Sequence, residues 1–104
     1  PLERDAARGE ALLRTAAAAG HSAAMTDLGR AYLSGDVLAQ DVGRGLELLE
    51  AAAAADNASA LTALGWAYWN GDNVARDPDH ARRLMRQAQA LGHPSADKFF
   101  ELFG

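Results

Sequence analysis

The sequence contains no cysteine, which excludes disulfides, thiol nucleophiles and cysteine-ligated metal sites. It also has no long hydrophobic run. The longest apolar stretch, LELLEAAAAA, is interrupted by Glu47 and Glu50 and is far shorter than the roughly 20 residues that a membrane-spanning helix needs. The motifs G-x-S-x-G, G-x-x-x-x-G-K and H-E-x-x-H are absent as well. These absences argue against membrane insertion and against the common nucleophile, phosphate-binding and zinc-protease chemistries.

An excess of positive charge is also missing. The net charge of −4 over 104 residues gives no electrostatic reason to expect nucleic acid or an anionic membrane as a partner. The one basic cluster consists of Arg76, His80, Arg82, Arg83 and Arg86. On an acidic chain we interpret this cluster as a solvated face rather than a nucleic-acid site.

Large apolar side chains are few, because alanine supplies much of the 49% hydrophobic content. The length of the chain supports one compact domain. Since only the larger side chains bury much area, we expect a thin core that is shared between several helices.

The sequence repeats itself. The segment LGRAYLSGD begins at Leu28 and LGWAYWNGD begins at Leu64, so the two copies are 36 residues apart. Other residues recur at the same offset: Asp5, Asp41 and Asp77; Leu12, Leu48 and Leu84; Ala16, Ala52 and Ala88; Ala24, Ala60 and Ala96. A period carried by so many positions indicates a repeated supersecondary unit.

The sequence of each unit predicts two helices. Asp41 and Asp77, the latter followed by Pro78, are suitable N-caps, and leucines three and four residues apart follow them. Breaks at Gly20, Asp56 and Gly92 end the helices. The predicted helices span residues 5–19, 22–34, 41–55, 58–70, 77–91 and 94–103. We therefore expect an all-α fold of about six helices, stacked as antiparallel hairpins.

Several glycines lie inside these predicted helices, Gly9, Gly29, Gly45 and Gly65 among them. Gly29, Gly45 and Gly65 each cost about 1 kcal/mol relative to alanine at such positions. We expect the close approach of a neighbouring helix to offset that cost.

The pattern A-x-x-x-L-G-x-x-Y-x-x-G-D, with an aspartate six residues after the last glycine, resembles the Sel-one-like repeat (SLR). SLR units are relatives of the tetratricopeptide repeat, so the resemblance implies an α/α solenoid, a superhelix of stacked hairpins. It covers almost the whole chain. It divides a single domain, 1–104, into the second helix of a truncated repeat (1–20), full repeats at 21–56 and 57–92, and a C-terminal capping helix at 93–104.

Two further features of the sequence bear on this assignment. Leu2 and Asp5 keep the pattern at the start of the chain, which predicts further repeats upstream. The family loop reads G-x-G-V, and its second glycine is replaced by Val37 in one unit and by Asn73 in the next. Because asparagine tolerates a positive φ and valine does not, we expect the first loop to depart from the family conformation.

In arrays of the tetratricopeptide type the first helix of each hairpin lines a concave groove. The resemblance thus implies a partner-binding face at equivalent positions of two helices: Thr26, Arg30, Leu33, Ser59, Thr62, Trp66, Trp69 and Asn70, bordered by Ser34 and Lys98. Aromatic and arginine side chains commonly anchor interfaces. Trp66 either packs against a neighbouring helix or contacts the partner, and Trp69, less typical of the family, is the stronger candidate for the groove.

Catalytic and metal-binding groups are not evident. His21, His80 and His93 share no helix face, so we interpret them as loop or cap residues and expect no metal and no cofactor. Glu47 and Glu50 lie on an outward face with no sign of the burial that acid–base catalysis uses.

We therefore expect a non-catalytic adaptor or scaffold that binds a protein or peptide on its concave face. The alternative is a purely structural or self-associating segment of a larger bacterial envelope or regulatory protein, stacked through an exposed N-terminal helix. Similarity to SLR proteins favours the bacterial periplasm over the cytoplasm, and the compartment stays open.

Overall fold

The computed structural model describes residues 21–36 and 38–104. Over these residues it is all-helical, which confirms the predicted fold class. The helices are α2 (Ser22–Ser34), α3 (Val42–Ala54), α4 (Ala58–Asn70), α5 (Pro78–Ala90) and α6 (Pro94–Phe103). Each agrees with its predicted range to within one residue at both ends. The predicted helix at 5–19 lies outside the described residues, as does Val37.

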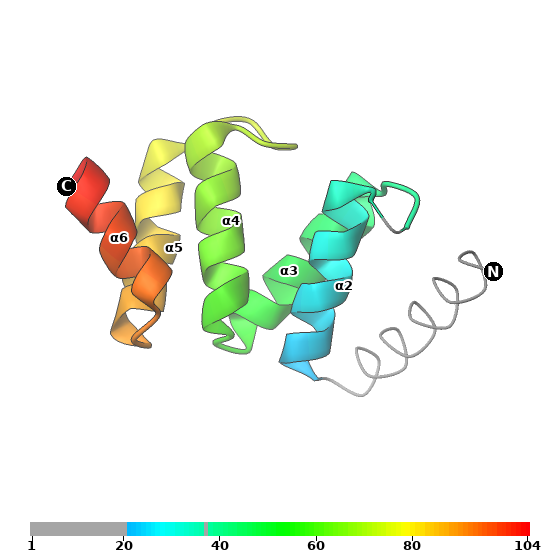
Figure 1. Cartoon of the computed structure of the whole chain (residues 1–104), viewed down its shortest axis with the longest axis horizontal. Helices are drawn as coiled ribbons and strands as arrows, with labels where there is room; N and C mark the ends of the chain where they lie inside the picture. The colour runs from blue at the N-terminus through cyan, green and yellow to red at the C-terminus, as the bar shows by residue number, and fades with distance from the viewer. Residues whose placement is uncertain (1–20, 37) are drawn as a thin grey trace.

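The helices stack in chain order, with α2 packed on α3, α3 on α4, α4 on α5 and α5 on α6 (Figure 1). The result is an elongated body of 46 × 24 × 19 Å. Such a stack has no central core. Each helix instead buries its apolar surface against its neighbours along the chain.

The helix starts follow the capping residues that the sequence contains. Asp41 and Asp77 each accept a hydrogen bond from a backbone N–H three residues later, at 3.1 Å in both cases, which confirms them as N-caps. Asn57 accepts in the same way from Ala60 N at 3.0 Å. His93 caps α6, since its Nδ1 accepts from Ser95 N at 3.1 Å.

The loops that end α2 and α4 are closed by the same bonds at equivalent positions. Gly35 and Gly71 leave these helices in the left-handed conformation, with φ of 70° and 76°. Further on, loop groups donate to carbonyls of the last helical turn: Asp41 N to Tyr32 O, Gln40 Nε2 to Leu33 O, Asp77 N to Tyr68 O and Arg76 Nε to Trp69 O. These bonds satisfy carbonyls that a helix end leaves without partners.

Asn73 has a φ of 62°, so the residue that replaces a family glycine does adopt the left-handed conformation. Its counterpart in the other loop, Val37, is not described.

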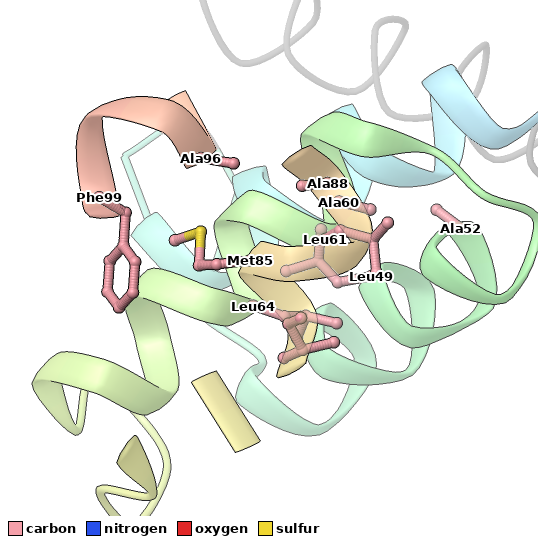
Figure 2. Packing of buried hydrophobic residues seen from close by; sticks show 10 residues of the cluster. Leu49, Ala52, Ala60, Leu61, Leu64, Met85, Ala88, Ala96 and Phe99 are labelled. Carbon is pink, nitrogen blue, oxygen red and sulfur yellow. The ribbon is translucent and has the colours of Figure 1, made fainter. Parts of the chain in front are cut away.

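The largest buried cluster runs through four helices (Figure 2). Its members are Leu49 and Ala52 of α3, Ala60, Leu61 and Leu64 of α4, Leu84, Met85 and Ala88 of α5, and Ala96 and Phe99 of α6. Four of these ten residues are alanine, which brings the helix axes close together and makes the core thin, as expected.

The glycines inside the helices lie where neighbouring helices approach. A Cβ built on Gly45 would lie 2.8 Å from the carbonyl oxygen of Gly29, and a Cβ on Gly29 would lie 2.9 Å from that of Gly45. In the α4–α5 pair the equivalent of Gly45 is Ala81, and a Cβ on Gly65 would meet only the side chain of Met85, 2.8 Å away at its nearest atom. Between α2 and α3, therefore, the backbones approach closely at both glycines, as expected from the cost of glycine inside a helix.

The tyrosine of each repeat contacts the following helix. The guanidinium of Arg44 lies over the ring of Tyr32, 5.9 Å from the ring centroid. One repeat later, Tyr68 packs edge-on against His80, which has the position of Arg44, with 4.5 Å between the ring centroids. Burial raises the pKa of the Tyr68 hydroxyl above its ordinary value, and the carboxylates of Glu50 and Asp77 add to this effect.

The backbone contact predicts different responses to one substitution at two glycines. Gly45→Ala gains about 1 kcal/mol of helix propensity but forces α2 and α3 apart, so we expect a net loss of about 1–2 kcal/mol in the free energy of unfolding. Gly65→Ala is the matched control, since the flexible end of Met85 can move, and we expect it to stay within about 1 kcal/mol of the parent. Urea denaturation followed by circular dichroism measures both. Equal losses for the two variants would contradict the role assigned to the backbone contact.

Two equivalent turns test the effect of the left-handed conformation. Gly92 has a φ of 82° with open space around its Cα, and the residue 36 positions earlier, Asp56, has a φ of 60°. We expect Asp56→Gly to stabilise the fold and Gly92→Ala to destabilise it, each by about 1 kcal/mol, because only glycine adopts this conformation without a steric penalty. Thermal unfolding gives both values. A destabilised Asp56→Gly variant would show that the aspartate side chain matters more than its backbone conformation.

Candidate functional site

A hollow of about 420 Å³ lies between α2 and α4. Its lining consists of Arg30, Leu33 and Ser34 from α2, Ala63, Trp66 and Ala67 from α4, and Asp72 and Asn73 from the loop that follows α4. Figure 1 shows this loop extending from the end of α4 toward α2. A second depression of about 370 Å³, lined by Asp27, Arg30, Ala31 and Ser34, shares two of these residues. We call the first of these the α2–α4 hollow.

The walls of the α2–α4 hollow combine apolar and polar groups. Leu33 and Trp66 are half-buried and give it an apolar side, while Arg30, Asp72 and Asn73 are exposed at its rim. Within the part of the chain that the structure describes, Arg30 has no hydrogen-bond or ion-pair partner. A hollow of this size, with an apolar side and polar groups at its rim, can accept a side chain of a ligand.

Three of the residues predicted for the partner-binding face line this hollow: Arg30, Leu33 and Trp66. Ser59 and Asn70 are exposed but lie outside its lining.

The two threonines of the predicted face are buried. Thr26 is only 2% exposed and Thr62 only 6%, because α2 and α4 are covered by neighbouring helices on more than one side. Their hydroxyls donate to carbonyls of their own helices, Thr26 to Ser22 O at 2.8 Å and Thr62 to Ser59 O at 2.9 Å. Neither side chain is available to a partner in this structure.

Trp69 packs inside the stack. Its ring centroid lies 5.0 Å from that of Phe99 and 4.8 Å from that of Phe103. The guanidiniums of Arg76 and Arg82 lie 5.2 and 5.6 Å from the same ring. Of the two tryptophans, Trp66 lines the hollow and Trp69 does not.

Trp66 packs against a neighbouring helix, which is one of the two roles that the sequence left open. Its ring contacts Phe99 at 5.3 Å and Phe103 at 6.1 Å, and its Nε1 donates to Ser95 Oγ at 3.2 Å. It is also part of the wall of the α2–α4 hollow. The indole thus connects the packing of α6 to the candidate site.

Four lining residues were not predicted as site residues. They are Ala63 and Ala67 of α4, and Asp72 and Asn73 of the loop that follows it. The available signal was the 36-residue period itself, because α6 carries phenylalanine at the positions equivalent to both alanines.

Neither a metal centre nor a membrane-spanning element is found in residues 21–36 and 38–104. No three His, Asp or Glu side chains there are grouped closely enough to hold a metal ion. No helix in the same ranges is both long and apolar enough to cross a bilayer. The predicted self-association surface on the N-terminal helix lies outside the described residues.

Comparison with known proteins agrees with the repeat architecture. The sequence model of the Sel1 repeat matches residues 1–21, 22–57 and 58–93. The crystal structure of a Sel1 repeat protein from Oxalobacter formigenes superposes with a TM-score of 0.75 at 32% identity, over 81% of this chain and 63% of that one. No curated protein sequence matches the chain.

Two further structures share the fold. A protective antigen present in uropathogenic Escherichia coli strains, which displays an SLR fold, gives a TM-score of 0.76 at 29% identity, over 86% of this chain and 20% of that one. Cysteine-rich protein B of Helicobacter pylori gives 0.79 at 19% identity, over 86% and 68%, and this likeness concerns the fold alone. The chain thus spans less than two thirds of the first two proteins.

The family match covers almost the whole chain, and the helices stack in the same way as in these structures. Proteins built of Sel1 repeats generally serve as non-enzymatic scaffolds for protein interactions. The chain belongs to the Sel1 repeat family.

Proposed function

We propose that this chain is a non-catalytic adaptor domain that binds a peptide or an extended protein segment on its concave face, at the α2–α4 hollow. The observation that carries the proposal is the hollow itself, a space of about 420 Å³ between the first helices of two successive repeats. Its volume lies in the range of roughly 300–1,000 Å³ that is usual for ligand sites.

The composition of the hollow supports a peptide as ligand. Leu33 and Trp66 offer an apolar surface to a side chain, and Asp72 and Asn73 can bond to a peptide backbone at the rim. Arg30 is exposed beside them and has no ion-pair partner in the described part of the chain. A guanidinium of this kind binds a carboxylate through two parallel hydrogen bonds, or a backbone carbonyl through one.

The proposal is tested by selecting ligands from a random peptide library displayed on phage, with the chain immobilised. Affinities of the selected peptides for purified variants are then measured by isothermal titration calorimetry. We expect Arg30→Ala to weaken binding about tenfold, which corresponds to about 1.4 kcal/mol and is usual for an interface arginine.

Arg86→Ala is the matched control, because Arg86 is also an exposed arginine, on α5 and outside the hollow. Thermal unfolding of both variants shows whether the fold is retained. If the library yields no ligand, or if the two arginine variants bind the selected peptides equally well, the α2–α4 hollow is not the binding site.

A further inference from the structure

The stack contains a second space that is equivalent to the α2–α4 hollow. The 36-residue period relates Arg30, Leu33, Ala63 and Ala67, which line the hollow, to Trp66, Trp69, Phe99 and Phe103. Trp66 and Trp69 belong to α4, and Phe99 and Phe103 belong to α6. The space between α4 and α6 thus has the same place in its repeat as the hollow between α2 and α4.

The α4–α6 space is filled by aromatic rings. Each tryptophan of α4 contacts Phe99 and Phe103 of α6, with centroid separations of 5.3 and 6.1 Å for Trp66 and 5.0 and 4.8 Å for Trp69. Phe99 is completely buried in this arrangement. Edge-on and tilted ring pairs of this kind stabilise a contact beyond the area they bury.

The α2–α4 space lacks those rings. Where α6 has Phe99 and Phe103, α4 has Ala63 and Ala67, so each position contributes a methyl group instead of a benzyl group. The missing rings leave a space, and the hollow of about 420 Å³ lies there. The structure therefore contains, one repeat further on, an example of what fills such a space.

We propose that the α2–α4 hollow receives an aromatic side chain of the partner, which takes the place that Phe99 and Phe103 take in the α4–α6 space. This inference rests on the proposed function and names the residue that anchors the peptide: phenylalanine, tyrosine or tryptophan.

The groups around the hollow favour an aromatic anchor over an aliphatic one. Trp66 presents its ring to the hollow, and Leu33 forms the apolar wall beside it. Arg30 occupies the position of Trp66 in the earlier repeat, and its guanidinium, which has no ion-pair partner among residues 21–36 and 38–104, can lie over the face of an incoming ring. The chain uses the same pairing elsewhere, since Arg76 and Arg82 lie over Trp69 at 5.2 and 5.6 Å.

A titration with single residues tests the inference without knowledge of the natural partner. The probes are N-acetyl-phenylalanine amide, N-acetyl-leucine amide and N-acetyl-alanine amide, added to the isotope-labelled chain and followed by NMR. We expect the phenylalanine probe to shift the methyl signals of Ala63 and Ala67 and the indole N–H signal of Trp66, with a Kd of about 1 mM. The Trp69 indole signal is expected to stay in place, the leucine probe to bind at least threefold more weakly, and the alanine probe to cause no shift.

A filled hollow provides the second arm. Ala63→Phe places a ring at the position equivalent to Phe99, and we expect it to abolish the shifts caused by the phenylalanine probe. Ala90→Phe, the same change at an exposed position of α5 outside the hollow, is expected to leave them unchanged. If Ala63→Phe loses its helical circular dichroism, Ala63→Leu fills part of the same space and is tested in its place.

Three results would overturn the inference. One is equal binding of the phenylalanine and leucine probes, and another is a folded Ala63→Phe variant that still binds the phenylalanine probe. The third is a concentration-dependent dimer that dissociates on Phe103→Ser, which would assign the hollow to a second copy of this chain. The peptide selection distinguishes this inference from the proposed function. Selected peptides whose binding depends on Arg30 but that contain no aromatic residue would refute the aromatic anchor and leave the proposed function intact. The absence of any peptide whose binding depends on Arg30 would refute the proposed function itself.

Discussion

Every first helix of a hairpin has to pack on several sides at once, and the rest of the structure depends on this constraint. α4 packs against α5 through Gly65 and Leu61, and against α6 through Trp66 and Trp69. Because little of its surface remains free, small residues are needed wherever a neighbouring backbone approaches, as at Gly29 and Gly45. Any binding site on such a helix must share residues with the packing, and Trp66 is the residue that it shares here.

The helices could be predicted from the sequence because their signals are local. Asp41 and Asp77 are strong N-caps with bonding partners three residues away, and Gly35, Gly71 and Gly92 favour the left-handed turns that end or follow helices. Such interactions depend on a few consecutive residues, so the sequence contains all of their parts. The repeat then supplied the stacking order, since units of equal length pack in equivalent ways.

The candidate site could be predicted only in part, because it depends on contacts between helices. The helical positions of Arg30, Leu33 and Trp66 place them on one face, and all three line the hollow. Thr26 and Thr62, predicted for the same face, are buried. Trp69 does not line the hollow, and the rings that pack on it, Phe99 and Phe103, come from the next repeat. The pattern within α4 does not contain these contacts.

The contrast between Ala63 and Phe99 has a consequence for how proteins of this architecture diversify. Both residues occupy one position of the repeat, and the lengths of the helices and loops around them are the same. Whether a repeat presents an open space or a closed one therefore depends on point substitutions at one or two positions, without insertion, deletion or change of fold. After a duplication of the unit, copies can differ in recognition while keeping the same stacking. A designer could open or close individual units in the same way.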